Sequence, residues 1–248
     1  FLDCIGMGTM GPETVEQIVR GVVDACRLCG AALLGGESAE LPGFYAEGEY
    51  DLVGFAVGTV ERENVIDGSK VVAGDVLLGL PSSGLHSNGY SLARYVLLDD
   101  PAIPLAEHMP ELGRTLGEEL LEPTRVYAGA LAKLFARAAA GDVPLPHALA
   151  HITGGGIEGN VARCVPDGMT ARIEAASIER LAIFNLIQSL GDIEEVEMRR
   201  TFNLGLGMAL AVAPEACDPT IAILADAGEE PMVIGEVVAG GDGGAVME

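Results

Sequence analysis

The chain has 248 residues, of which 49% are hydrophobic and 21% are charged. This composition is typical of a globular protein and excludes a disordered chain. Acidic residues outnumber basic ones by 37 to 14, which gives a formal net charge of −23. Nucleic acids and anionic membranes bind basic surfaces, so we expect neither as a partner.

Cysteine usage and hydropathy predict a cytoplasmic location. Five cysteines are scattered along the chain, which indicates free thiols in a reducing compartment. Cys26 and Cys29 form a lone Cys-x-x-Cys pair, and without a second pair for zinc we interpret both as buried helix residues. No apolar run reaches the ~18 residues of a membrane span, and we find no signal peptide.

Strands and helices are predicted in the first quarter of the chain. Pro12–Cys29 is expected to be a helix, because Pro12 suits a first turn and apolar residues recur on one stripe. Ala31–Leu34 predicts a short buried strand, and Asp51–Val60 predicts another. Turn residues follow between Asn64 and Gly74, and there we place a domain boundary. The expected domains are residues 1–67 and 68–248.

The second predicted domain continues the alternation of strands and helices. Its predicted strands are Val76–Leu80, Ala148–Thr153, 169–174, 205–213 and 231–239. Its predicted helices are Tyr90–Leu98, 111–121, 124–140, a short helix ending near Cys164, 178–190 and 215–227. This alternation predicts α/β layers.

Three glycine-bearing stretches are interpreted as turns between a strand and a helix, where a ligand could bind. The first is Gly35-Gly36-Glu37-Ser38-Ala39-Glu40. Glycine lets the backbone approach a ligand, and the carboxylates of Glu37 and Glu40 are candidate ligands for Mg²⁺. A tight turn with solvated acids explains the same residues equally well.

The second stretch is Ser82-Ser83-Gly84-Leu85-His86-Ser87-Asn88-Gly89, which follows a buried strand and opens a helix. Backbone N–H groups at a helix start attract phosphate, and neutral donors from Ser83, Ser87 and Asn88 would help. His86 could act as a general acid or base, or as a cation that faces a phosphate. The alternative is a helix-capping serine beside an exposed histidine.

The third stretch, His151-Ile152-Thr153-Gly154-Gly155-Gly156, precedes a predicted helix. Packing alone does not readily explain three successive glycines. We therefore expect the backbone of Gly154, Gly155 and Gly156 to approach a phosphate closely. We interpret His151 as a core histidine.

Two further residues are candidates for ligand binding. Arg125 lies in a predicted first helical turn, where its charge is unfavourable for the helix dipole, which indicates a role toward a ligand. Asn203 precedes a Gly-x-Gly.

These stretches, in collinear order, resemble the phosphoribosylformylglycinamidine cyclo-ligase family, the aminoimidazole ribonucleotide synthetases. The matching segments are Phe1-Leu2-Asp3, Leu34–Gly43, Tyr50–Phe55, Ile66–Lys70, Ser82–Leu92, Pro123–Tyr127, His151–Gly156 and Arg200–Met208. They span nearly the whole chain, which is more specific than any single glycine-rich motif.

The resemblance implies a two-domain α/β (α+β) fold whose second domain is a mixed sheet flanked by helices. It also implies a homodimer with a β-barrel shared between first domains. The expected reaction uses ATP and Mg²⁺ to convert a phosphoribosyl substrate, formylglycinamidine ribonucleotide, to aminoimidazole ribonucleotide. His86 is then the expected catalytic residue. Residues 83, 84, 87, 88, 125, 154–156 and 203 would bind substrate or phosphate.

The chain departs from the family pattern in two respects. Cys4-Ile5 and Thr9 stand where the family has an aromatic pair and a lysine. The family's upstream segment, with a glycine-rich loop and an Asp-Gly-Val-Gly-Thr-Lys motif, has no counterpart here, so we expect a truncated first domain. Alternative functions are a related ATP-using enzyme, such as a selenophosphate synthetase, a thiamine-monophosphate kinase or the amidotransferase-linked synthetase, and a non-catalytic nucleotide-binding remnant.

Overall fold

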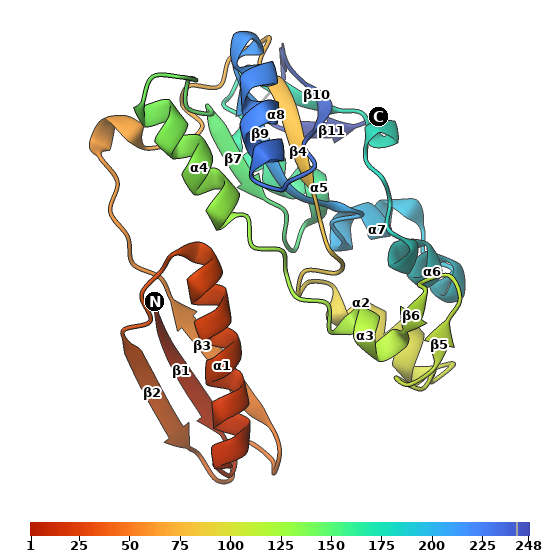
Figure 1. The fold of residues 1–248 in the computed structure, drawn as a ribbon. Coiled ribbons are helices and arrows are strands. Elements are labelled where there is room, and N and C mark those ends of the chain that lie inside the picture. Colours follow the sequence, from red (N-terminus) through yellow and green to blue (C-terminus); the bar gives the residue numbers. More distant parts are fainter. Residues whose placement is uncertain (242) are drawn as a thin grey trace. The chain divides into compact units, whose positions relative to one another are not determined.

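The computed structural model describes residues 1–241 and 243–248 (Figure 1). They divide into two compact units: Phe1–Val65 with Val126–Gly129, and Ile66–Arg125 with Ala130–Glu248. Both units combine strands with helices, which confirms the predicted α/β (α+β) class. Within the described residues, no helix has the length and apolarity needed to cross a membrane.

The first unit is a three-stranded sheet with one helix on it (Figure 1). Its elements are β1 (Leu2–Met7), α1 (Pro12–Cys29), β2 (Gly35–Glu40) and β3 (Tyr50–Phe55), with the strands in the order β2-β1-β3. β1 is parallel to β2 and antiparallel to β3, so α1 is the crossover between two parallel strands. The helix has the predicted bounds, and Cys26 on it is buried whereas Cys29 is exposed.

The predicted strand at Ala31–Leu34 is wrong, and so is the predicted turn after it. Residues 31–34 are irregular and Leu34 is 76% exposed, while the glycine-rich segment itself forms β2. Gly36 lies opposite Asp3 in the parallel register, and a Cβ atom at Gly36 would clash with the Asp3 carboxylate. This glycine therefore accommodates a neighbouring side chain. β3 is also shorter than the predicted strand at 51–60.

The second unit is built on a six-stranded mixed sheet in the order β11-β8-β10-β4-β9-β7. The strands are β4 (Val76–Pro81), β7 (Ala148–His151), β8 (Met169–Ile173), β9 (Leu206–Val212), β10 (Met232–Ala239) and β11 (Ala245–Met247). β8 and β11 are parallel, and the other neighbouring pairs are antiparallel. β9 is buried at every position, so both of its faces are covered.

Helices flank this sheet, as predicted, and α4 and α8 lie on the same side of it (Figure 1). They are α2 (Tyr90–Arg94), continued as a π-turn over Tyr95–Asp99, then α3 (Leu116–Leu120), α4 (Ala128–Ala139), α5 (Gly156–Val161), α6 (Ala182–Gly191), α7 (Glu195–Thr201) and α8 (Cys217–Asp226). Short 3₁₀ turns cover Arg62–Asn64, Ala162–Cys164, Ala175–Ser177 and Pro214–Ala216, and a small hairpin joins β5 (His108–Met109) to β6 (Arg114–Thr115).

Several predicted bounds in this unit need correction. The helix expected at 111–121 is only α3, because the residues before it form the β5–β6 hairpin. α4 begins at Ala128, so Arg125 precedes the helix and the argument from its dipole fails. α6 likewise begins later, at Ala182. α7 and β11, which are seven and three residues long, were not predicted from the sequence.

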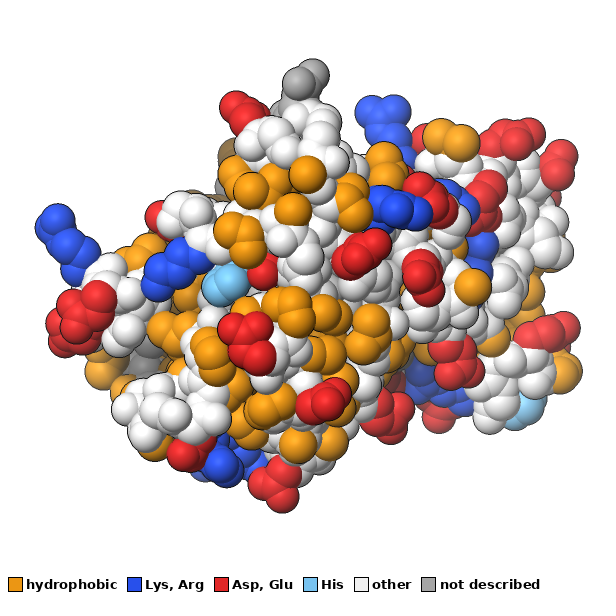
Figure 2. Space-filling model, turned by 90° about the horizontal axis from the view of Figure 1, so that it is seen from above, with side chains coloured by type: hydrophobic (Ala, Val, Ile, Leu, Met, Phe, Trp, Pro, Cys, Tyr) orange, Lys and Arg blue, Asp and Glu red, His pale blue; other side chains and the backbone are white. Residues whose placement is uncertain are grey.

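The strong negative charge is distributed over the surface. Figure 2 shows acidic side chains spaced across one face among hydrophobic and basic ones, rather than gathered in a single patch. Such a surface repels free anions as a whole. An anionic ligand therefore needs a local site that supplies donors or positive charge.

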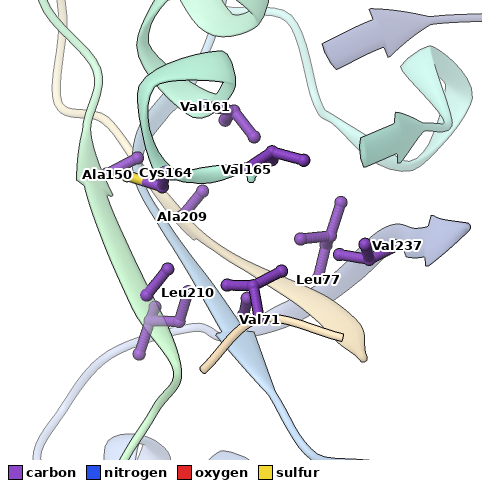
Figure 3. Close-up of a pocket in the computed structure, with 11 residues that line it drawn as sticks. Val71, Leu77, Ala150, Val161, Cys164, Val165, Ala209, Leu210 and Val237 are labelled. Atoms are coloured by element: carbon purple, nitrogen blue, oxygen red, sulfur yellow. The ribbon is translucent and has the colours of Figure 1, made fainter. Parts of the chain in front are cut away.

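A small apolar cavity of about 10 Å³ lies in the core (Figure 3). Val71, Leu77, Val161 and Val237 are among the side chains that point toward it. A volume of this size corresponds to about one water molecule, and an apolar lining leaves such a gap dry. The cavity is therefore a packing gap and not a ligand site.

Candidate functional site

Two of the predicted turns meet at one edge of the six-stranded sheet. The first connects β4 to α2 over residues 82–89, and the second connects β7 to α5 over residues 152–155. β4 and β7 both run antiparallel to β9, which lies between them. Their carboxyl ends therefore lie at the same edge, next to the amino end of β9. Asn203 lies just before that end of β9.

Asn203 ties the segment before β9 to the 82–89 turn. Its side-chain amide donates a 2.9 Å hydrogen bond to the carbonyl of Gly84. Its Oδ1 atom accepts hydrogen bonds from the Ser82 hydroxyl at 2.8 Å and from the Gly205 N–H at 2.9 Å. With 2% exposure, Asn203 positions the turn and does not itself face a ligand.

Asn88 ties the first turn to the glycine loop. Its Oδ1 atom accepts a hydrogen bond of 2.9 Å from the N–H of Gly154, and its amide donates to the carbonyl of His86 at 2.6 Å. Asn160, which is buried in α5, donates a 2.7 Å hydrogen bond to the carbonyl of Gly156 and so holds the end of the same loop. Side-chain amides thus fix both loops.

Non-glycine residues with positive φ are concentrated at this edge. Among the described residues five such cases occur, and His86 (φ 54°), Ser87 (φ 57°) and Leu204 (φ 52°) are three of them. L-residues rarely adopt this left-handed region, and such strain is found most often at functional sites. The backbone geometry therefore marks this edge as a candidate site.

His86 is buried within its turn, which excludes the alternative of an exposed histidine. It is 2% exposed, and its Nε2 atom accepts hydrogen bonds from the backbone N–H groups of Ser83 at 2.9 Å and Arg125 at 3.3 Å. The Ser83 hydroxyl lies 2.9 Å from the same nitrogen and donates to the carbonyl of Pro123. Because Nε2 accepts two N–H groups, the neutral ring carries its proton on Nδ1.

Burial and, to a lesser extent, the nearby His151 and Arg125 together lower the pKa of His86 to about 4, against a small opposing effect of Glu122. The ring is therefore neutral at physiological pH. This pKa does not support the hypothesis that His86 is a cation facing a phosphate. A protonated Nε2 would also lose both hydrogen bonds that it accepts from the backbone.

Arg125 lies next to this turn, but its guanidinium group is already paired. Its Nε atom is 3.0 Å from a carboxylate oxygen of the buried Glu229, and its Nη2 atom donates to the carbonyl of Gly228. Arg114 is likewise paired with Glu119 and Glu122, at 2.6 Å each. The charges of these two arginines are therefore already balanced by carboxylates of the protein.

The three glycines of the second loop have different roles. Gly155 (φ 100°) and Gly156 (φ 68°) adopt left-handed conformations, and a Cβ atom at Gly156 would clash with the carbonyl of Arg199 in α7. Packing therefore does explain Gly156, contrary to the expectation from sequence. Gly154 is exposed, but its N–H is engaged by Asn88.

Two polar side chains at this edge, Thr124 and His151, were not predicted from the sequence as site residues. The hydroxyl of Ser87 lies 3.5 Å from that of Thr124. His151, interpreted from sequence as a core residue, is exposed instead, and its ring centroid is 6.5 Å from that of His86. Its place directly before the glycine loop was the available signal. Partial burial lowers the pKa of His151 as well.

Glu37 and Glu40 are not brought together. Both lie in β2, where side chains three positions apart point to opposite faces, so the two carboxylates do not share one ion. They also belong to the first unit, whereas the residues described above belong to the second. Nowhere in residues 1–241 and 243–248 do three or more His, Cys, Asp or Glu side chains form a group that could hold a metal.

The fold defined by these elements is that of the AIR synthase-related proteins. Residues 1–60 match the family "AIR synthase related protein, N-terminal domain", and residues 72–248 match "AIR synthase related protein, C-terminal domain". The chain is 50% identical over 242 residues to the phosphoribosylformylglycinamidine cyclo-ligase of Sorangium cellulosum, covering 98% of this chain and 68% of that protein. It is 49% identical over 238 residues to the enzyme of the same name from Desulfitobacterium hafniense, covering 96% and 67%.

The chain therefore belongs to the phosphoribosylformylglycinamidine cyclo-ligase family, which confirms the resemblance drawn from the sequence. It spans about two thirds of the length of these relatives.

Solved structures with less sequence similarity share the fold alone. Escherichia coli HypE, a hydrogenase maturation protein, matches with a TM-score of 0.63 at 19% identity, covering 99% of this chain and 68% of HypE. Thiamine-monophosphate kinase from Stenotrophomonas maltophilia matches with a TM-score of 0.63 at 17% identity, covering 100% and 71%. Thermotoga maritima PurL in complex with FGAR matches with a TM-score of 0.56 at 16% identity, covering 96% and 35%.

Proposed function

We propose that this chain carries out its part of the ATP-dependent ring closure of formylglycinamidine ribonucleotide to aminoimidazole ribonucleotide. In this reaction the terminal phosphoryl group of ATP moves to the formyl amide oxygen and ADP leaves. The amidine nitrogen then attacks the activated carbon, and phosphate departs with that oxygen as the ring forms. The close relatives bear the name of this activity.

The observation that carries the proposal is the meeting of the 82–89 turn and the glycine loop at one sheet edge. Phosphoryl transfer requires donors that are already in place when charge develops on the phosphoryl oxygens. The hydroxyls of Ser87 and Thr124 and the exposed backbone of Gly155 lie at this edge. We assign these groups to the phosphate-bearing part of the substrate or to the transferring group.

The roles of the other predicted residues follow from their contacts. His86, buried and neutral with Nε2 engaged, is proposed as a positioning residue that holds Ser83 and Arg125 in register. Asn203 and Asn88 hold the loops, and Gly84 contributes its carbonyl to Asn203. His151, exposed beside them, is the better candidate for moving a proton.

The remaining expectations stay proposals. Mg²⁺ would neutralise the triphosphate, but we assign it no ligand in this chain. A homodimer agrees with the face of the three-stranded sheet opposite α1, where Leu2, Val53 and Phe55 share one side in the strand register and are exposed. A cytoplasmic location follows from the pathway that the relatives' name implies.

An assay of aminoimidazole formation from ATP and formylglycinamidine ribonucleotide tests the function. We propose measuring the chain alone and joined to the upstream segment of the Sorangium cellulosum relative. ATP-dependent product from the joined protein is the expected result. A folded joined protein without turnover would contradict the proposal, whereas turnover by the chain alone would show that it needs no upstream segment.

A further inference from the structure

A second candidate site lies in the second unit among α5, α7, β11 and the 3₁₀ turn Ala175–Ser177. It is a cavity of about 130 Å³. Its lining combines the charged side chains of Arg180, Glu195 and Arg199 with apolar ones, which are Ile157, Ala175, Ile178, Leu204 and Met247. These charged residues are separate from the loop residues assigned above.

The charges in this cavity do not balance. Glu195 accepts hydrogen bonds on one oxygen from Arg180 at 2.9 Å and from Gln188 at 3.0 Å, and on the other from Arg199 at 3.2 Å. Two guanidinium groups therefore share a single carboxylate. These hydrogen bonds also outweigh the effect of burial and lower the pKa of Glu195, so it stays ionised and the cluster keeps a net positive charge.

Two nitrogen atoms of the Arg180 guanidinium group donate no hydrogen bond within the described part of the protein. Its Nε and Nη2 atoms are buried and find no hydrogen-bond acceptor among the described residues. A buried guanidinium N–H without an acceptor is costly, and such groups indicate a water or an ion that satisfies them. Arg199 donates to Glu195 and to the carbonyl of Met247, so it is held firmly at the same cavity.

We propose that this cavity binds a phosphate group. Paired guanidiniums match phosphate oxygens in geometry, and the apolar walls strengthen the attraction by lowering the local dielectric. In a chain of net charge −23, a partly buried site with excess positive charge is where a compact anion gains most. The volume accommodates a single phosphate group, either free or at the end of a small phosphomonoester.

Isothermal titration of the folded protein tests the site, with inorganic phosphate and ribose 5-phosphate as probes and acetate at matched ionic strength as the comparison. Arg180→Gln should weaken phosphate binding roughly tenfold or more, because it removes the spare donors. Glu195→Gln should strengthen it, because the carboxylate competes with the anion for both arginines. Arg172→Gln, in the exposed pair of Arg172 with Glu248, should leave the affinity unchanged.

Opposite changes in phosphate affinity for Arg180→Gln and Glu195→Gln distinguish a binding site from a purely structural ion pair. If Arg180→Gln unfolds the protein, the other two variants still test the site. Glu195→Gln should then raise the affinity for phosphate, and Arg199→Gln should lower it. Equal affinities in all variants would overturn the proposal, because phosphate would then be bound elsewhere and water would occupy the cavity. Acetate binding as tightly as phosphate would overturn it too. Ribose 5-phosphate binding that follows the same pattern would assign a phosphomonoester.

Discussion

The side-chain amide of Asn203 donates a buried hydrogen bond of 2.9 Å to the carbonyl of Gly84, 119 residues earlier in the chain. The same side chain accepts hydrogen bonds from Ser82 and Gly205. One asparagine thus joins the start of the 82–89 turn to the segment that enters β9. This contact therefore helps to set the shape of the candidate site.

Truncation of Asn203 should therefore destabilise the second unit. Asn203→Ala leaves a buried carbonyl, hydroxyl and N–H without partners, and each unsatisfied group costs about 1–3 kcal/mol. We expect a loss of at least about 2 kcal/mol in the free energy of unfolding measured in urea. Asn185→Ala, an exposed position in α6, is the control and should change little. Equal stability of both variants would contradict the role of Asn203.

The buried His86 should make stability depend on pH. Its pKa is about 4 in the folded protein against 6.5 in the unfolded chain, so between these pH values the unfolded state binds more protons. The free energy of unfolding should fall as the pH drops from 6.5 toward 4. His86→Gln should flatten this part of the curve, whereas His108→Gln, at an exposed position, should not. An NMR titration of His86 near pH 6.5 would refute the account.

The glycine loop offers a matched pair of substitutions within α5. Gly156→Ala places a Cβ against the carbonyl of Arg199 at a φ of 68°, and we expect a loss of about 1–3 kcal/mol in unfolding free energy. Gly159→Ala meets nothing within 4 Å and should instead stabilise the helix by about 0.5–1 kcal/mol. Thermal unfolding of both variants measures whether the stability falls for Gly156→Ala and rises for Gly159→Ala. A stable Gly156→Ala variant would mean that α5 and α7 pack less closely than described.

The sequence predicted what is local and missed what depends on distant partners. The 82–89 turn and the helix at Pro12–Cys29 follow from short-range turn and stripe patterns, and both are observed. Gly36 was predicted to lie in a turn, but a glycine is needed there because the Asp3 side chain on the neighbouring strand leaves no room for a Cβ atom. The burial of His86 depends on which loops meet at the sheet edge, and no local pattern encodes that.

The exposed hydroxyl of Ser87 provides the most direct test of the central claim, that the 82–89 turn binds the reacting phosphoryl or phosphate group. The measurement is kcat/KM for aminoimidazole formation by Ser87→Ala in the joined protein, with Ser91→Ala in α2 as the matched control. A hydrogen bond to a charged group contributes about 1.5–3 kcal/mol, so Ser87→Ala should lower kcat/KM roughly tenfold or more without loss of stability. Ser91→Ala should match the unaltered protein. Equal kcat/KM for both variants would contradict the assignment of this turn to the site.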